Sequence, residues 1–322
     1  MNSSIKKGLK IIVPIVLAIF LGWYAFSEFP LAKVWPFVKK ANIWWILLGL
    51  FFGVLSHLSR AYRWNYLLQP LGYKAQLPNS VMAVFVGYLA NFGIPRSGEV
   101  LRAMVLTNYE KVPFEKGFGT IVAERVADVL VMLGIIAITL ILQFDYIFTL
   151  LEKAFSFQKI IMGSAILLII SVVIFIYLKK SQTLLAVKIR TFIKGLKEGV
   201  FSILNMEHKW AFIGHTLFIW GMYILMFYVT LFAVDEISHV TLGMVLVAFI
   251  AASFTIATTN AGLFAYPLAV MTAFSLFNIP QDPSYAFGWI IWSSQTIMLV
   301  VCGVISFIFL PIYNTKKIVG VE

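Results

Sequence analysis

Long apolar stretches recur along the whole chain, and they constrain its fold more than any other feature. A helix that crosses the hydrocarbon core of a bilayer needs about 20 mainly apolar residues. Six stretches meet this requirement, at residues 11–27, 42–59, 117–143, 159–178, 210–234 and 286–311. Apolar residues make up 61% of the chain and charged residues 12%, against about 45–50% and about 25% in soluble domains. We therefore expect an all-α polytopic membrane protein, which excludes a soluble enzyme, a secreted disulfide scaffold and a nucleic-acid module.

Two further apolar stretches, at 80–107 and 240–277, are interrupted by polar residues. The first is broken at 91–99, which reads Asn-Phe-Gly-Ile-Pro-Arg-Ser-Gly-Glu, and the second at 258–262, which reads Thr-Thr-Asn-Ala-Gly. Because Gly, Pro and short polar residues interrupt regular helices, each stretch is expected to bend at its break.

The distribution of basic residues predicts which loops are cytoplasmic, because such loops carry an excess of Lys and Arg. The segment 179–209 has seven basic residues against two glutamates, and the two tails and the 59–79 loop are also basic. The Asp235-Glu236 turn fits the outside, whereas the basic 28–41 loop argues weakly against this orientation. With these sides assigned, each broken stretch begins and ends on the same side, which predicts two re-entrant hairpins.

The predicted fold is thus about six transmembrane helices plus two re-entrant hairpins in an inverted repeat, with eight full spans as the alternative. Residues 1–322 would form a single membrane domain, with 1–150 as the first inverted half and 151–322 as the second. The protein would be a multi-pass protein of the cell (inner) membrane with both termini cytoplasmic. Inverted repeats with interrupted helices are a recurring transporter plan, and substrates bind at the interruptions.

Charged residues concentrate in the first half of the chain, at positions near or inside the predicted membrane. Ionisable groups at this depth are costly and usually face a cavity or a partner. The cluster consists of Arg60, Arg63, Arg96, Glu99, Arg102, Glu124, Arg125 and Asp128. Arginine can bind phosphate through two parallel hydrogen bonds and stays charged when it is desolvated. The cluster therefore suits an anionic phospholipid headgroup, and equally a structural ion-pair network whose arginines extend to water.

Spacing predicts which of these charges can meet. Glu124 and Asp128 are four residues apart and share a helix face, and Arg125 and Asp128 are three apart and can form a pair. The arginine at 96, the glutamate at 99 and the arginine at 102 form one stripe if that limb is helical. A helix that starts after the first break would add free backbone N–H groups and a positive dipole end.

The second break is chemically different, because its polar residues carry no charge. They are Thr255, Thr258, Thr259, Asn260 and Tyr266. These side chains either line a pathway or satisfy the backbone groups that a broken membrane helix leaves open. Tryptophans near the predicted span ends, among them Trp64 and Trp210, are expected at the membrane interface.

No motif for catalysis or metal binding is present in the sequence. The single cysteine, Cys302, excludes an intramolecular disulfide, and the four histidines show no metal-ligand spacing. There is no nucleophile elbow, phosphate-binding loop or zinc-protease helix motif. We therefore expect no cofactor, no metal and no enzymatic activity; a lipid-modifying enzyme that uses Glu124 or Asp128 as a base is a weak alternative.

Several of the charged residues stand in a recognisable pattern. It reads Asn91, Pro95-Arg96-Ser97-Gly98-Glu99 and Arg102, then Glu124-Arg125 and Asp128, with Arg60 and Arg63-Trp64 before Leu67-Leu68. This pattern resembles the lysylphosphatidylglycerol synthase transmembrane-region family of flippase-like membrane proteins. The second hairpin departs from that family's glycine-rich segment, and only Gly262 and Tyr266-Pro267 match it. The resemblance implies an inner-membrane protein that moves lipid between leaflets, without the soluble aminoacyl-transferase domain of the namesake.

The leading hypothesis is a translocator of a phospholipid or related anionic lipid, in which arginines engage phosphate and carboxylates orient the arginines. The alternative is a non-transporting membrane scaffold that partners an envelope-lipid or glycan enzyme. Expected partners are membrane lipids, with a membrane protein or a second copy also considered and nucleic acid excluded. The expected substrate-binding residues are Arg60, Arg63, Asn91, Arg96, Glu99, Arg102, Glu124, Arg125, Asp128, Thr259, Asn260 and Tyr266.

Overall fold

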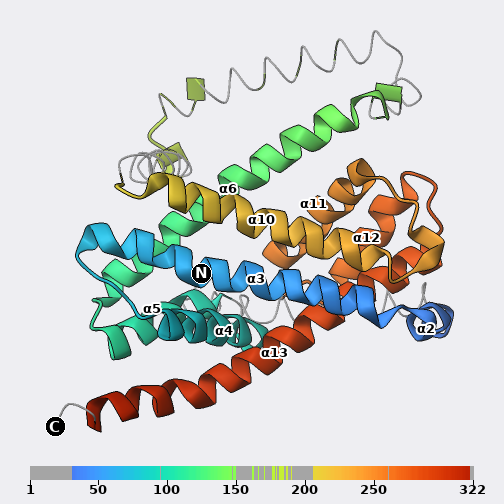
Figure 1. The fold of residues 1–322 in the computed structure, drawn as a ribbon. Helices are drawn as coiled ribbons and strands as arrows, with labels where there is room; N and C mark the ends of the chain where they lie inside the picture. Colours follow the sequence, from blue (N-terminus) through green and yellow to red (C-terminus); the bar gives the residue numbers. More distant parts are fainter. Residues whose placement is uncertain are drawn as a thin grey trace, which may run out of the picture. The chain divides into compact units, whose positions relative to one another are not determined.

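The computed structural model describes residues 31–94, 96–146, 206–259 and 261–319 continuously, together with scattered positions between 148 and 190. The regular elements of these residues are all helices (Figure 1), which confirms the predicted all-α class. They are α2 (Leu31–Lys40), α3 (Ile43–Leu68), α4 (Leu77–Gly93), α5 (Ser97–Glu110), α6 (Phe114–Leu142), α10 (Lys209–Leu231), α11 (Leu242–Thr258), α12 (Ala265–Ser275) and α13 (Gln281–Val319), with the 3-10 turns η1 (Gln69–Leu71) and η2 (Asp235–Ile237).

Four of these helices are long and apolar enough to cross a membrane. They are α3 with η1, α6, α10 and the part of α13 from Gln281 to Thr315. These four correspond to four of the six expected spans. The other two, at 11–27 and 159–178, lie entirely or mostly outside the described residues. The connection at 28–41 contains the short helix α2.

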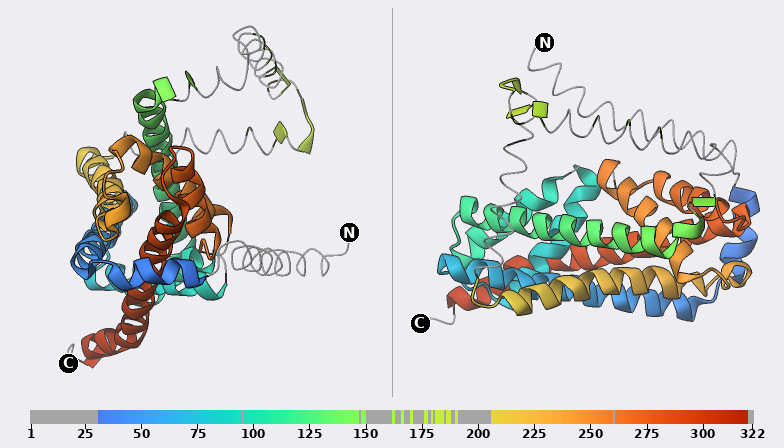
Figure 2. Two further views of the ribbon diagram at one scale, coloured as in Figure 1. Left: turned by 90° about the vertical axis from the view of Figure 1, so that its right-hand side faces the viewer. Right: turned by 90° about the horizontal axis from the view of Figure 1, so that it is seen from above.

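The chain divides into two compact units, Met1–Glu124 with Trp210–Glu322, and Arg125–Lys209. In the first unit, α3 and α10 lie side by side (Figures 1 and 2). Gly49 and Gly53 of α3 sit against Met226 of α10, and Gly49 also meets Thr230. Two glycines four residues apart let helix backbones approach closely, which is a common way to pack helices in membranes.

Helix α3 extends nine residues beyond the predicted end of its span at residue 59. Its start is fixed by Asn42, whose side-chain oxygen accepts a hydrogen bond of 3.0 Å from the backbone N–H of Trp44. The helix runs on through Arg60 and Arg63, which are both buried. The first part of the predicted 59–79 loop is therefore helical, with these two arginines held inside the unit.

The first broken stretch forms a helical hairpin of α4 and α5, which confirms the predicted break. The two helices pack along each other through Gly87 and Gly98, where a side chain on Gly98 would collide with the backbone of Gly87. Between them, Arg96 adopts a left-handed conformation with φ 64°. Asn91 then caps α5, because its side-chain oxygen accepts a 2.8 Å hydrogen bond from the N–H of Gly98. At 1.5 Å per residue, the two limbs are about 25 Å and about 21 Å long, shorter than a hydrocarbon core of about 30 Å.

The second broken stretch forms a hairpin of α11 and α12, which also confirms the predicted break. Ala261, Gly262 and Phe264 in the connection all have positive φ values, of 54°, 75° and 60°. The indole N–H of Trp292 on α13 donates a 2.8 Å hydrogen bond to the carbonyl oxygen of Ala261 and holds this turn in place.

Helix α13 packs against both hairpins, through α4 and through α12 (Figures 1 and 2). Near its C-terminal end, the side-chain amides of Asn314 and Asn79 exchange two hydrogen bonds of 2.9 and 3.0 Å. Asn79 also donates to a carboxylate oxygen of Glu110 at 2.6 Å. This buried polar contact joins the start of α4, the end of α5 and the end of α13.

Candidate functional site

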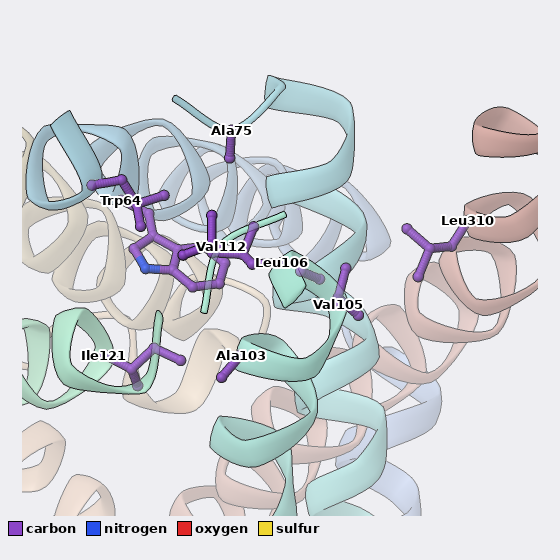
Figure 3. Packing of buried hydrophobic residues seen from close by; sticks show 10 residues of the cluster. Trp64, Ala75, Ala103, Val105, Leu106, Val112, Ile121 and Leu310 are labelled. Carbon is purple, nitrogen blue, oxygen red and sulfur yellow. The ribbon is translucent and has the colours of Figure 1, made fainter. Parts of the chain in front are cut away.

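An apolar core surrounds Trp64 where α3, α4, α5 and the first turns of α6 meet. Its buried members include Ala103 and Leu106 of α5, Val112 of the α5–α6 connection, and Ile121 of α6 (Figure 3). Trp64 is itself fully buried. The prediction that it belongs to an interfacial belt was therefore wrong, whereas Trp210 is 76% exposed as such a belt requires.

Arg102 is held between this tryptophan and a carboxylate. Its guanidinium carbon lies 4.2 Å from the centroid of the Trp64 ring. Its Nη1 donates a 2.9 Å hydrogen bond to Glu124 Oε2, and the two side chains are 6% and 1% exposed. The Trp64 indole N–H donates in turn to the hydroxyl of Thr120 at 2.8 Å. The stacking and the ion pair together fix the plane of the guanidinium.

These contacts leave two donor atoms of Arg102 without a hydrogen-bond acceptor among the described residues. They are Nε and Nη2, and both are buried. These two nitrogens share one edge of the planar guanidinium, and such an edge matches two oxygens of a phosphate or carboxylate. An unsatisfied buried donor is costly, so this edge is a candidate binding point for an anionic group.

Arg63 approaches the same carboxylate from α3. Its Nη2 lies 3.7 Å from Glu124 Oε1, and its Nη1 donates a 2.8 Å hydrogen bond to the hydroxyl of Thr216 on α10. Its guanidinium carbon lies 5.1 Å from the centroid of the Phe212 ring. We call Arg63, Arg102 and Glu124 the arginine cluster. It contains two positive charges for one negative charge, at a depth where charge is costly.

The other predicted residues of the first break have different positions. Arg96 is exposed and precedes α5, so the predicted stripe of charges is correct only from Glu99 onward. Glu99 is half-buried in the first turn of α5, where a negative charge is favourable at the positive end of the helix dipole. Asn91 was predicted to bind substrate, and the structure shows its side-chain oxygen bound to the backbone of α5. Arg60 is buried on α3, one turn before Arg63.

Arg125 and Asp128 belong to the second unit. Their predicted contact is confirmed, since Arg125 Nη1 lies 3.6 Å from Asp128 Oδ2. The arginine side chain is 44% exposed and the aspartate side chain 9% exposed.

The threonines of the second break bind backbone groups. The hydroxyl of Thr259 donates to the carbonyl of Thr255 at 2.7 Å and accepts from the N–H of Gly262 at 3.2 Å. Tyr266 is buried in the first turn of α12. Asn260 lies outside the described residues. The contacts of Thr259 agree with the expectation that polar side chains here bind backbone groups that a broken helix leaves open. That these residues line a substrate pathway stays a prediction.

Sequence reasoning missed the hydroxyl partners Thr120 and Thr216. Each hydroxyl donates to the carbonyl of a residue three or four positions earlier, as threonine commonly does in membrane helices. The oxygen of Thr120 can then accept from Trp64, and that of Thr216 from Arg63. Only the tertiary fold shows these partners. In the part of the chain that the structure describes, no three His, Cys, Asp or Glu side chains come together as metal ligands would.

The fold, its apolar helices and its buried charges define a multi-pass membrane protein. Residues 11–303 match the family model of the lysylphosphatidylglycerol synthase TM region, and the chain belongs to this family. No solved structure gave a significant match.

The curated relatives match only parts of the chain. A UPF0104 membrane protein of Methanocaldococcus jannaschii is 29% identical over 106 residues, which cover 32% of this chain and 32% of that protein. A UPF0104 membrane protein of Pyrococcus horikoshii is 28% identical over 170 residues, covering 51% and 48% of the two chains. The glycosyltransferase AglD of Haloferax volcanii is 30% identical over 89 residues, covering 27% of this chain and 14% of AglD. The chain thus spans half or less of the relatives that it matches.

Proposed function

We propose that the protein translocates a phospholipid with an anionic headgroup between the leaflets of the cell membrane. The observation that carries this proposal is the open edge of Arg102 within the buried arginine cluster. Trp64 and Glu124 hold the guanidinium plane, so a phosphate would meet donors that are already oriented. A preorganised donor pair reduces the ordering cost of binding.

The α4–α5 hairpin supports a transport role for this site. Arg102 lies on the limb that follows the break, and the exposed Arg96 lies at the break itself. An anionic headgroup could therefore pass from an accessible arginine to a buried one along a single limb. Both hairpins have limbs shorter than a full membrane crossing, and we infer that they are re-entrant. Broken helices of this kind meet at substrate sites in many transporters.

The proposed topology has six crossings, with both termini cytoplasmic and the two hairpins in inverted halves, 1–150 and 151–322. The basic segment 179–209 supports this orientation. The proposal assigns binding and movement of lipid to the chain and no chemical reaction. A second copy of the chain or another membrane protein is a proposed partner.

A second candidate function is a non-transporting scaffold that partners an envelope-lipid or glycan enzyme. It is favoured by one observation, the similarity of 89 residues to a protein named as a glycosyltransferase. Under this hypothesis the arginine cluster stabilises the membrane domain and moves no lipid.

Reconstitution into liposomes separates the two functions. Vesicles would carry a phosphatidylglycerol with a fluorescent headgroup or chain label, and a membrane-impermeant quencher would report the fraction of label in the outer leaflet. The translocator predicts that wild-type protein exposes inner-leaflet label faster than empty vesicles do, and that Arg96→Ala slows this exchange. The scaffold predicts a different result. Wild-type protein, Arg96→Ala and empty vesicles would show equal exchange rates, and a lipid- or glycan-modifying enzyme would co-purify stably with the protein.

A further inference from the structure

A groove of about 620 Å³ lies between α3 and α10, and Leu77 at the start of α4 also lines it. Its walls include Leu55, Leu58 and Tyr62 of α3 and Gly214 and Phe218 of α10. Leu58, Tyr62 and Phe218 are each at least 40% exposed although both helices are membrane-span candidates. In a bilayer, exposed apolar side chains on such spans meet acyl chains rather than water.

Polar groups gather at one end of this groove. The hydroxyl of Ser59 and Nδ1 of His215 are hydrogen-bonded across the two helices at 2.8 Å. The His215 ring lies 5.1 Å from the ring of Tyr62 and 5.8 Å from that of Tyr66. The groove therefore combines apolar leucine, alanine and phenylalanine side chains with a hydroxyl, an imidazole and a phenol group. A membrane lipid combines the same two kinds of group, a hydrocarbon tail and a polar ester and headgroup.

The polar end is next to the arginine cluster. Ser59 precedes Arg63 by about one helical turn, or about 6 Å along α3. His215 is adjacent in sequence to Thr216, the hydroxyl that accepts a hydrogen bond from Arg63. A lipid whose tail lies in the groove would thus bring its negative headgroup to the end where the positive charge of the cluster is held.

We infer that the α3–α10 groove binds one acyl chain of an anionic glycerophospholipid, with the ester region at the Ser59–His215 pair. The inference deepens the proposed function, on which it rests for the identity of the lipid, by assigning a lateral entry site to the substrate. The apolar lining accounts for the tail, and the complementary charge of the arginine cluster accounts for the headgroup.

Two glycines of α10 provide a matched test. A Cβ added at Gly214 or at Gly221 meets no heavy atom within 4 Å among the described residues, so both sites have room for a side chain. Gly214 lines the groove, whereas Gly221, two turns further along the same helix, does not. Gly214→Phe would fill the groove, and Gly221→Phe adds the same side chain outside it.

The probe is a phosphatidylglycerol that carries a diazirine in one acyl chain, photolysed with full-length protein in nanodiscs. We expect wild-type protein to be labelled on peptides that contain 55–62 or 211–218, with at least a fivefold lower yield in Gly214→Phe and an unchanged yield in Gly221→Phe. Uniform labelling of all spans, or an unchanged yield in Gly214→Phe, would overturn the inference. Because this assay reads binding alone, translocation without groove labelling refutes the groove, and groove labelling without translocation refutes the proposed function.

Discussion

Glu124 is the carboxylate on which both arginines of the cluster converge, and its neutralisation is the most informative single change. Glu124→Gln keeps the size and one hydrogen-bond acceptor but removes the only negative charge of the three residues. Arg102 would lose a charge-assisted contact of 2.9 Å and Arg63 one of 3.7 Å, both within side chains that are almost fully buried. Breaking a buried pair by removing one partner costs about 3–5 kcal/mol. Because glutamine retains an acceptor, we expect about 3 kcal/mol.

The assay is thermal unfolding of the purified protein, followed by the fraction that stays monodisperse after heating. At about 2–4 °C per kcal/mol for a domain of 150–250 residues, the expected loss is roughly 6–12 °C. Glu115→Gln, an exposed change in the first turn of the same helix, is the control and should cost less than about 1 kcal/mol. The double variant Glu124→Gln with Arg102→Met should recover most of the loss, because it also removes the guanidinium that had paired with Glu124 at 2.9 Å. If Glu124→Gln melts within 2 °C of wild type, the two arginines do not depend on this carboxylate and the reasoning fails.

Three further changes test the packing of the hairpins and of α13, each by the same thermal assay. Gly98→Ala places a methyl group against the facing backbone of Gly87 and should cost at least about 1–3 kcal/mol of stability. Gly93→Ala in the same hairpin, with open space around it among the described residues, should leave the stability nearly unchanged. Equal effects of the two changes would contradict the close helix contact. Asn314→Ala removes both hydrogen bonds of the buried amide pair and should cost about 1–3 kcal/mol, and no loss would show that the pair is not formed. Trp292→Phe removes the donor to the carbonyl of Ala261 and should cost about 1 kcal/mol, and a gain in stability would argue against this contact.

The order of helices and the two hairpin breaks could be predicted from the sequence, because both follow from local chemistry. A long apolar run has few alternatives to a helix in a membrane. The clustered Gly, Pro and polar residues at 91–99 and 258–262 mark the places where such a helix ends. The Arg125–Asp128 contact was predictable for the same reason, since residues three apart on a helix are neighbours.

The composition of the arginine cluster could be predicted only in part. Charge and spacing pointed to Arg63, Arg102 and Glu124, but not to the buried Trp64 ring against which Arg102 packs. A tryptophan near a predicted span end satisfies the interfacial pattern equally well, and only contacts between α3, α5 and α6 decide between the two positions. The amide pair of Asn79 and Asn314 joins residues 235 positions apart, and no local pattern reveals such a contact.

The account depends on one claim, that the excess positive charge of the arginine cluster serves to bind lipid phosphate and not to stabilise the fold. Arg102→Met tests this claim directly, because it leaves Arg63 and Glu124 as a balanced pair and puts an apolar side chain of similar length against Trp64. The measurement is the translocation rate of fluorescent phosphatidylglycerol in proteoliposomes, made on the same preparation as the melting temperature. The account predicts a rate that falls to that of empty vesicles, with a loss of stability no larger than that expected for Glu124→Gln, about 3 kcal/mol. A wild-type rate accompanied by a clear loss of stability would show that the cluster is structural and would contradict the account.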